Sequence, residues 1–377
     1  WYPGAGLYRN VHLIITEDAY IPVWGTYITT PSVNEKFAKV NVRTKVVLPE
    51  GADPAKYSVE TSVWNPNKQK LTAVRTSLAQ MKYNNNQAEQ EFVIQAPSLW
   101  SPEMPALYSA ETRLYEGDKL KDIYTTPFGI RSIEIIPDKG FFLNGKRTVF
   151  KGVCNHHDLG PLGAAVNDAA IRRQIRILKD MGCNAIRTSH NMPAPELIRA
   201  CDEMGMMIMA ESFDEWNVAK CKNGYNLLFD EWAEKDLVNL LHNFRNNPSV
   251  VMWCIGNEVP NQWNEGDCKI AKWLQDICHR EDPTRPVTQG MDAPDAVVNN
   301  NFAAVMDVAG FNYRPFKYKI NYKKLPQRIV LGSETASTVS SRGVYKFPVE
   351  RKAMAKYDDH QASSYDVEHC GWSNLPA

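Results

Sequence analysis

Residues 250–258 read Val-Val-Met-Trp-Cys-Ile-Gly-Asn-Glu, an apolar run that ends in a carboxylate, Glu258. A second run, Ile-Val-Leu-Gly-Ser-Glu at residues 329–334, ends in the same way at Glu334. A short, continuous apolar run is typical of a strand buried on both faces, as in a parallel sheet covered by helices. The carboxyl ends of such strands form the rim where parallel barrels place their chemistry. We therefore expect Glu258 and Glu334 to lie together at one rim.

Two carboxylates on separate strands of one barrel suit glycoside hydrolysis, in which one donates a proton and the other acts as the nucleophile. A single glutamate after a strand is as often a neighbour of a helix cap, a solubilising loop residue or half of a surface ion pair. The pair favours the catalytic interpretation, because neither Glu258 nor Glu334 is followed at helical spacing by an obvious basic partner. Asn257 adds a hydrogen-bond donor and acceptor beside Glu258, where a sugar hydroxyl could be held.

The composition argues against several classes of partner. Lysine and arginine total 43, as do aspartate and glutamate, so there is no net basic field for nucleic acid or an acidic membrane. No apolar stretch approaches the roughly 18 residues that span a bilayer, and residues 1–4 do not resemble a signal peptide. The eight cysteines lie between Cys154 and Cys370 without a C-x-x-C or a zinc-type spacing, so a metal site or redox pair has little support.

The first third of the chain has the pattern of an all-β domain. Segments with strand-like alternation are separated by turn-forming residues such as Pro49-Glu50-Gly51 and Asn65-Pro66-Asn67. This spacing is typical of an immunoglobulin-like sandwich of about 100 residues. The expected strands include residues 11–15, 38–47, 57–64 and 106–114.

From Phe141 onward, strand-like runs alternate with amphipathic helical stretches, for example residues 168–181 and 230–244. Repeated βα units imply a parallel sheet, and seven of them indicate a (β/α)₈ TIM barrel with one unit missing. The seven expected strands are residues 148–153, 185–188, 206–210, 250–255, 286–288, 305–311 and 329–331.

The missing unit indicates an incomplete barrel. Only residues 335–377 follow Glu334, and none of them is a convincing eighth buried strand. Residues 1–10 have the composition of a loop between domains. We therefore expect the sequence to be a fragment that is truncated at both ends, with the barrel ending before strand 8.

With these residues assembled, the chain resembles glycoside hydrolase family 2 over essentially its whole length. The resemblance implies three ranges: residues 1–10 end an N-terminal sugar-binding jelly roll, 11–133 form the immunoglobulin-like sandwich, and 134–377 form the catalytic barrel. The segments that carry the resemblance are residues 1–13, 99–103, 107–108, 128–131, 142–146, 156–158, 187–191 and 256–258.

The resemblance assigns a role to each matching residue. Glu258 would be the general acid/base and Glu334 the nucleophile, and Asn257 would hydrogen-bond the 2-hydroxyl of the sugar. Tyr313 would orient the nucleophile, and Arg187 would keep it ionised.

Four further residues are implied as walls of the sugar pocket: His156, His190, Asp158 and Trp216. A structural role competes with binding at each position. A histidine at a strand end is commonly a structural hydrogen-bonding group, and Asp158 and Trp216 could serve loop or core packing.

Three positions depart from the family pattern. Asn247 stands where histidine is common, and residues 335–337 lack the nearby histidine that some β-galactosidases use against the sugar. Residues 213–217 lack the histidine of an active-site magnesium site, although Glu215 could be a partial ligand. We therefore expect no required metal and no cofactor.

Residues 333–337 together with 341–343 most resemble the β-galactosidase branch, so the resemblance implies a retaining glycosidase that acts on terminal β-galactosides. β-Glucuronidase is the first alternative and β-mannosidase the second. A third alternative is a catalytically inactive remnant that only binds carbohydrate. The expected partner is a carbohydrate substrate, with no nucleic acid and no membrane. Homo-oligomerisation stays open, as does the location, with the periplasm or secretion favoured over the cytoplasm.

Overall fold

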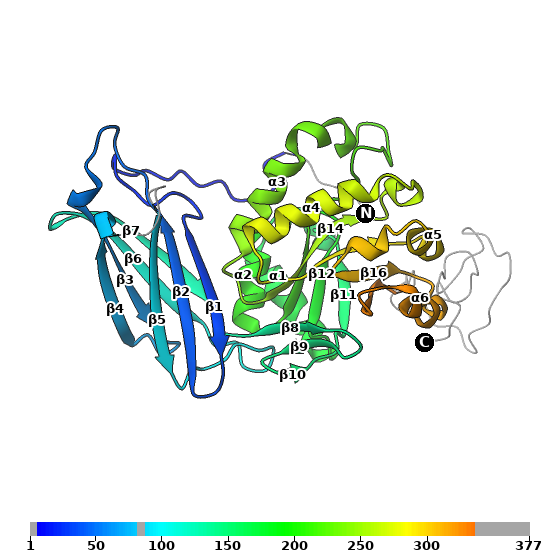
Figure 1. The fold of residues 1–377 in the computed structure, drawn as a ribbon, viewed down its shortest axis with the longest axis horizontal. Coiled ribbons are helices and arrows are strands. Elements are labelled where there is room, and N and C mark those ends of the chain that lie inside the picture. Colours follow the sequence, from blue (N-terminus) through cyan, green and yellow to red (C-terminus); the bar gives the residue numbers. More distant parts are fainter. Residues whose placement is uncertain (1–5, 81–86, 336–377) are drawn as a thin grey trace.

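The computed structural model describes residues 6–80 and 87–335. These residues form an antiparallel β-sandwich and, beside it, a parallel barrel surrounded by helices (Figure 1). The sandwich lies at the left of Figure 1, in blue and cyan, and the barrel lies at the right, in green to orange. The expected order of an all-β domain followed by an α/β barrel is confirmed.

The sandwich consists of one sheet of three strands and one sheet of four, with all neighbours antiparallel. Along β2, Ala38, Val40 and Val42 are buried and alternate with more exposed residues, as expected for a strand with one face on the core. The first sheet is ordered β1 (Thr26–Val33), β2 (Phe37–Lys45) and β5 (Gln87–Gln95). The second is ordered β4 (Lys70–Ser77), β3 (Tyr57–Trp64), β6 (Tyr108–Glu116) and β7 (Lys119–Phe128).

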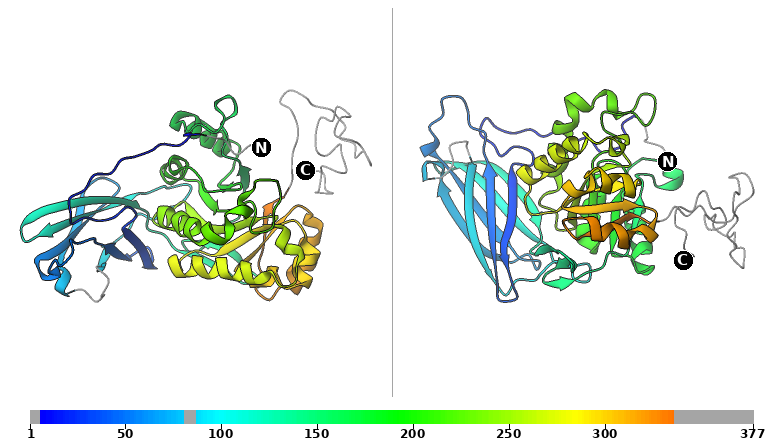
Figure 2. Two further views of the ribbon diagram at one scale, coloured as in Figure 1. Left: turned by 90° about the horizontal axis from the view of Figure 1, so that it is seen from above. Right: turned by 45° about the vertical axis from the view of Figure 1, so that its right-hand side comes forward.

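The strand expected at residues 11–15 is wrong. Residues 6–18, dark blue in Figure 2, run as an irregular segment from the barrel to the sandwich. Val11, Leu13 and Ile15 are 78%, 88% and 86% exposed. Alternation alone does not make a strand, because a strand also needs a partner for its main-chain groups. Within the described residues, 11–15 have no such partner.

Within residues 6–80 and 87–335, seven strands of the barrel pair in parallel and in chain order, which confirms the predicted βα repeat. They are β11 (Gly152–Asn155), β12 (Ala185–Thr188), β13 (Met207–Glu211), β14 (Val250–Asn257), β15 (Val287–Met291), β16 (Val308–Asn312) and β17 (Val330–Glu334). The helices around them are α1 (Asp168–Asp180), α2 (Pro195–Met204), α3 (Phe229–Phe244), α4 (Cys268–Glu281), α5 (Pro294–Asn299) and α6 (Tyr318–Lys324).

Six of the seven strands differ from the expected ranges by one to four residues at one or both ends, and residues 185–188 match. β11 begins four residues later than predicted, at Gly152, and β16 begins at Val308 because residues 303–305 form a 3-10 turn first. Helix α1 agrees closely with its prediction. Ile171, Ile175 and Leu178 form its buried face, and Asn167 caps its first turn by accepting a hydrogen bond from the main-chain N–H of Ala170.

Strands β11 and β17 are the two edges of the parallel ladder. The thiol of Cys154 on β11 lies 3.3 Å from the carbonyl oxygen of Ser333 on β17, so the two edges approach each other at one point. The prediction that no eighth strand follows concerns residues that, apart from Thr335, lie outside the described ones. Residues 1–5 of the expected jelly-roll segment also lie outside them.

A small antiparallel sheet covers the amino-terminal end of the barrel (Figure 1). Ile135 from this sheet and the nearby Phe150 pack against buried Met252, Val308 and Ile329 inside the barrel. This packing closes the end opposite the predicted chemistry. The sheet consists of β8 (Ile133–Ile136), β9 (Gly140–Leu143) and β10 (Lys146–Arg147).

The sandwich fixes the start of β14. Arg131 is buried and donates from Nε to the carbonyl oxygen of Pro248 (2.6 Å) and from Nη2 to that of Val250 (2.7 Å). A Cβ atom at Gly129 would lie 2.5 Å from the Pro248 ring, so glycine is needed for this close approach. The strand that carries Asn257 is therefore held at its amino end by the other domain.

Candidate active site

Glu258 directly follows β14, with a backbone φ of +43°. Its main-chain N–H donates to the carbonyl oxygen of Gly290 (2.7 Å), and its Oε1 accepts a hydrogen bond from Nδ2 of Asn312 (2.7 Å). Burial raises the pKa of Glu258, and the nearby charges of Asp292 and Glu334 act in the same direction, against the Asn312 hydrogen bond. A raised pKa keeps the carboxyl group protonated longer, as a general acid requires.

Glu334 is the last residue of β17, and both of its carboxylate oxygens have partners. Oε2 accepts a hydrogen bond from Nη1 of Arg187 (3.0 Å), and Oε1 accepts one from the hydroxyl of Tyr313. The main-chain N–H of Tyr313 also donates to the Glu334 carbonyl oxygen, at 2.5 Å. A carboxylate held on both oxygens, one of them by a charge-assisted hydrogen bond from a guanidinium, is fixed in place.

Arg187 is the centre of the site. Its guanidinium is buried and donates to three side-chain oxygens: Nη1 to Glu334, Nη2 to Oδ1 of Asn257 (2.8 Å), and Nε to Oε2 of Glu211 (2.5 Å). Burial alone would lower the pKa of Arg187, but the charge of Glu211 and the groups around it raise that pKa well above its usual value. The guanidinium therefore stays charged and joins the predicted nucleophile to the predicted sugar-binding asparagine.

The amide of Asn257 has a fixed orientation. Oδ1 accepts hydrogen bonds from Arg187 and from Asn312 (3.0 Å), and Nδ2 donates to Oδ1 of Asp214 (2.9 Å). Lys220 contacts both of these residues: its Nζ lies 2.8 Å from Oδ1 of Asp214 and 2.7 Å from the carbonyl oxygen of Asn257. The Asn257 amide carries a second N–H, which these contacts do not use.

Two predicted histidines lie beside the nucleophile. Nδ1 of His190 is 2.7 Å from Oε1 of Glu211, and its Nε2 is 3.9 Å from Oε2 of Glu334. The rings of His156 and His190 meet edge to face, with centroids 5.0 Å apart. Burial and the neighbouring His190 lower the pKa of His156 to about 4, so its imidazole is neutral near neutral pH.

The larger of two cavities near these residues has a volume of about 780 Å³ and extends along the open side of the barrel. Cys154, His156, Arg187 and Glu334 line its carboxyl-end part, and apolar side chains such as Met252 line the rest. The predicted nucleophile is thus exposed to a space large enough for a sugar ring.

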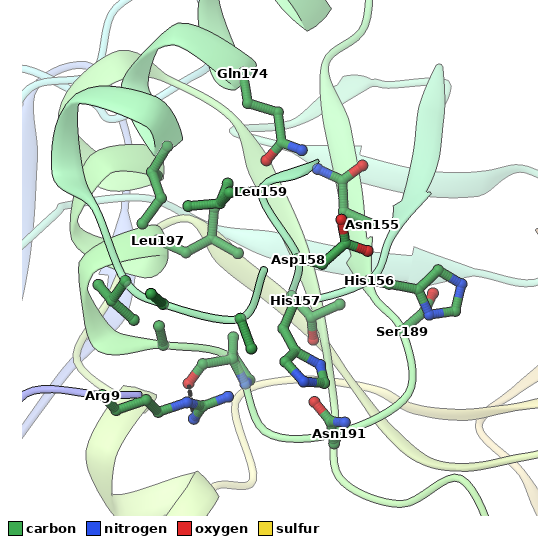
Figure 3. A pocket seen from close by; sticks show the side chains of 17 residues that line it. Arg9, Asn155, His156, His157, Asp158, Leu159, Gln174, Ser189, Asn191 and Leu197 are labelled. Carbon is green, nitrogen blue, oxygen red and sulfur yellow. Dashed lines mark hydrogen bonds between the residues drawn. The ribbon is translucent and has the colours of Figure 1, made fainter. Parts of the chain in front are cut away.

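Asp158 and His156 also line a smaller cavity of about 50 Å³, between the loop after β11 and helices α1 and α2. Figure 3 shows its labelled side chains, with His156 and Arg9 on opposite sides of the view. The carboxylate of Asp158 accepts a hydrogen bond from the main-chain N–H of Gly160 (3.1 Å), and neither Glu258 nor Glu334 lines this cavity. Asp158 therefore lies on the adjoining loop, outside the network around Arg187.

Trp216 is not brought together with these side chains. Its indole is 0% exposed, donates from Nε1 to the carbonyl oxygen of Ile255 (2.8 Å) and stacks on Phe302. A Cβ atom at Gly256 would lie 2.9 Å from this indole nitrogen. Trp216 therefore has the core-packing role that the sequence allowed as an alternative to lining the pocket, and its indole supports β14.

The site residues that sequence reasoning missed are Glu211, Asn312, Asp214 and Lys220. Glu211 had a readable signal, because it ends the apolar run of β13 just as Glu258 and Glu334 end theirs. The other three belong to a hydrogen-bond network between strand ends and the loop after β13, which no local pattern encodes.

Glu215, the partial metal ligand considered from sequence, uses its carboxylate to hold its own loop. It accepts hydrogen bonds from the main-chain N–H groups of Lys220 (2.6 Å) and Asn226 (3.0 Å). Within residues 6–80 and 87–335, no group of three or more histidine, cysteine, aspartate or glutamate side chains is arranged to hold a metal ion. The same residues contain no helix with the length and apolar content of a membrane-spanning segment.

A parallel barrel with carboxylates after its fourth and seventh strands is the arrangement of a glycosidase. The family description "Glycosyl hydrolases family 2, TIM barrel domain" matches residues 134–367, and "Glycosyl hydrolases family 2" matches residues 20–131. The chain belongs to glycoside hydrolase family 2.

Two relatives with assigned activities match this chain over almost its whole length. The β-galactosidase BoGH2A of Bacteroides ovatus is 36% identical, over 99% of this chain and 48% of the relative. A putative β-glucuronidase of Formosa agariphila is 32% identical, over 92% of this chain and 31% of the relative. The chain therefore spans about half or less of the length of these relatives.

Solved structures agree with the fold. A crystal structure of a glycosyl hydrolase family 2 member from Bacteroides cellulosilyticus superposes with a TM-score of 0.83 and 37% identity, over 89% of this chain and 43% of that one. A β-glycosidase from Bacteroides vulgatus gives a TM-score of 0.81 and 34% identity, over 92% of this chain and 42% of that one.

Proposed function

We propose that the protein is a retaining glycosidase that hydrolyses terminal β-linked sugars, with β-galactosides as the preferred class. The observation that carries the proposal is the continuous set of contacts from Glu258 through Asn312, Asn257 and Arg187 to Glu334. It supports two carboxylates with different roles, one with a raised pKa and one held by a buried cation.

In the first step, a carboxylate oxygen of Glu334 bonds to the anomeric carbon while the bond from that carbon to the leaving-group oxygen breaks. Glu258 transfers its proton to the leaving oxygen. In the second step, Glu258 removes a proton from water, the water oxygen bonds to the anomeric carbon, and the ester to Glu334 breaks. The configuration at the anomeric carbon is retained because it is inverted twice.

The surrounding residues supply positioning. Tyr313 and Arg187 hold the two oxygens of Glu334, and the free N–H of Asn257 donates to the 2-hydroxyl of the sugar. His156 and His190 form the wall of the sugar pocket beside the nucleophile. Asp158 is proposed as a wall residue on the adjoining loop. The site is proposed to need no metal or cofactor, and the proposed domain ranges remain 11–133 and 134–377.

Two features support a galactoside: the sequence around Glu334, and the 36% identical relative that is named a β-galactosidase. Residues 336–343, which carry part of the first argument, lie outside the described residues. β-Glucuronidase is the alternative, because the 32% identical relative and another at 31% identity carry that name. A protein that only binds carbohydrate would not need one carboxyl group of raised pKa and a second one held by a buried guanidinium.

A panel of aryl β-glycosides tests the proposal. We expect kcat/KM to be highest for the galactoside among the galactoside, glucuronide and mannoside, and we expect Glu334→Ala and Glu258→Ala to lower it strongly. A higher kcat/KM for the glucuronide or the mannoside would show that the preferred sugar is not galactose, but it would leave the proposed mechanism unchanged. Absence of turnover on the whole panel, with binding retained, would support the binding-only alternative.

A further inference from the structure

Glu211 is a buried charged residue of the site that has no role in the reaction steps proposed so far. It is the last residue of β13 and is 0% exposed. Its main-chain N–H donates to the hydroxyl oxygen of Thr188 at the end of β12 (3.0 Å). The carboxylate is therefore held between two strands, beneath the side chains that face the cavity.

Both oxygens of this carboxylate have charged or polar partners. Oε2 accepts from Nε of Arg187 at 2.5 Å, and Oε1 lies 2.7 Å from Nδ1 of His190. Burial alone would raise the pKa of Glu211, but the charge of Arg187 and the contact with His190 lower it. An ionised carboxylate with no exposure is stable only with such partners.

Through Arg187, Glu211 determines the position of two groups that meet the substrate. A guanidinium is planar and rigid, so a contact at Nε fixes the directions in which Nη1 and Nη2 donate. Those two nitrogens bind Glu334 and Asn257. Loss of the Nε contact would free the plane of the guanidinium to turn.

Through His190, Glu211 determines which ring nitrogen carries the proton. Of the two neutral tautomers of an imidazole, a carboxylate at Nδ1 favours the one that carries its proton on Nδ1. In that tautomer Nε2, which lies 3.9 Å from Oε2 of Glu334, is the acceptor nitrogen.

Glu211 also keeps the site balanced in charge during the reaction. Arg187 lies between two carboxylates, Glu211 and Glu334. When Glu334 forms its ester with the sugar, it loses its charge, and Glu211 alone remains as the counter-ion of the buried guanidinium. Without Glu211, formation of the ester would leave a buried cation unpaired.

From these contacts we propose that Glu211 is a positioning residue of the reaction: it orients Glu334 and Asn257 through Arg187 and fixes the acceptor nitrogen of His190. The inference rests on the proposed glycosidase function. It predicts that Glu211 favours formation of the glycosyl ester, although it does not touch the substrate.

Glu211→Gln tests the proposal, because the amide keeps the size of the side chain but presents a donor to Arg187 or to His190. The matched control is Glu196→Gln on α2, a buried glutamate whose partner is Asn10. Two rates are measured: kcat/KM for an aryl glycoside as a function of pH, and inactivation by a 2-fluoro glycosyl fluoride.

We expect Glu211→Gln to lower both rates by about tenfold or more. We also expect it to move the acidic limb of kcat/KM to lower pH, because Glu334 then faces the cation without a competing anion. Glu196→Gln should change neither rate. Glu211→Asp, which keeps the charge but shortens the reach, should restore the acidic limb while kcat/KM stays low.

An unshifted acidic limb in Glu211→Gln, or an equal loss of both rates in Glu196→Gln, would overturn the positioning role. If Glu211→Gln does not fold, nitrogen NMR of the wild-type protein decides, since a neutral His190 with its proton on Nε2 contradicts the proposal. Failure of the 2-fluoro reagent to label Glu334 in the wild type would instead contradict the glycosidase function itself.

Discussion

Tyr313 contacts Glu334 at both ends of the glutamate, through its hydroxyl to the carboxylate and through its main-chain N–H to the carbonyl oxygen. The backbone of Tyr313 has a φ of +58°, which turns the chain back over the end of β17. One residue thus fixes both the strand end and the direction of the side chain. A carboxylate held in this way loses little freedom when it attacks.

The first prediction concerns this hydroxyl. Tyr313→Phe removes one of the two hydrogen bonds that hold the Glu334 carboxylate, so we expect kcat to fall by about tenfold to a hundredfold with little change in folding. The matched control is Tyr318→Phe, because the Tyr318 hydroxyl donates to the carbonyl oxygen of Phe311 (3.3 Å) and not to the Glu334 carboxylate. Equal kcat values for the two variants would contradict an orienting role for Tyr313.

The second prediction is that Glu334 forms the covalent intermediate. A 2-fluoro glycoside of the correct sugar should inactivate the protein and add one sugar mass to the peptide that contains Glu334. Arg187 lies 3.0 Å from this carboxylate and fixes its position for attack on the anomeric carbon. Mapping of the added mass to any other residue would remove Glu334 from this role.

The third prediction concerns the leaving group. Glu258 donates the proton that a poor leaving group needs, so Glu258→Ala should lower kcat/KM by about 10² to 10⁴ for such substrates and much less for activated aryl glycosides. Addition of azide should restore turnover of the activated substrates. A similar loss for good and poor leaving groups would argue against proton donation by Glu258.

The fourth prediction uses the pKa of the same residue. Because burial raises the pKa of folded Glu258 above its unfolded value, its neutral form favours folding, and this contribution is lost as pH rises through the folded pKa. Glu258→Gln imitates the neutral form. We expect the variant to gain in Tm relative to wild type as pH rises from about 5 to about 8, as measured by thermal unfolding. A constant difference in Tm across that range would contradict it.

The fifth prediction concerns stability at the junction of the two domains. Arg131→Met leaves the carbonyl oxygen of Pro248 without its buried donor and removes one of the two arginines that donate to Val250, the other being Arg285, so we expect a loss of about 1 to 3 kcal/mol in the free energy of unfolding. Arg147→Met is the control, because Arg147 is exposed and its side chain donates to the carbonyl oxygen of Lys139. Urea unfolding should separate the two variants.

The sequence predicted the parts of this protein that depend on local pattern. The seven strands and helix α1 follow from apolar periodicity, and Glu258 and Glu334 follow from their places at strand ends. The segment at residues 11–15 shows the limit of that reasoning. Its alternation is real, but within the described residues nothing pairs with it.

Other misses have a different cause. Asn312 and Asp214 lie 55 and 43 residues from Asn257 in the sequence, so the network that orients the amide exists only after the strands have assembled. Trp216 follows a strand, as a pocket residue would, but its loop turns the indole behind β14 into the core. Position along the chain does not specify the side to which a loop residue turns.

The hydrogen bonds from Arg131 to the start of β14 and to the residue Pro248 before it bear on how enzymes of this kind can be recombined. The proposed acid/base residue follows a strand whose opposite end is bound by the sandwich, so the two modules share one structural element. A barrel transplanted onto a foreign sandwich would inherit the Pro248 carbonyl group, which needs an arginine at the matching place. Exchange of domains between relatives should therefore succeed most often when the seam is placed upstream of Gly129, so that the arginine and the strand travel together.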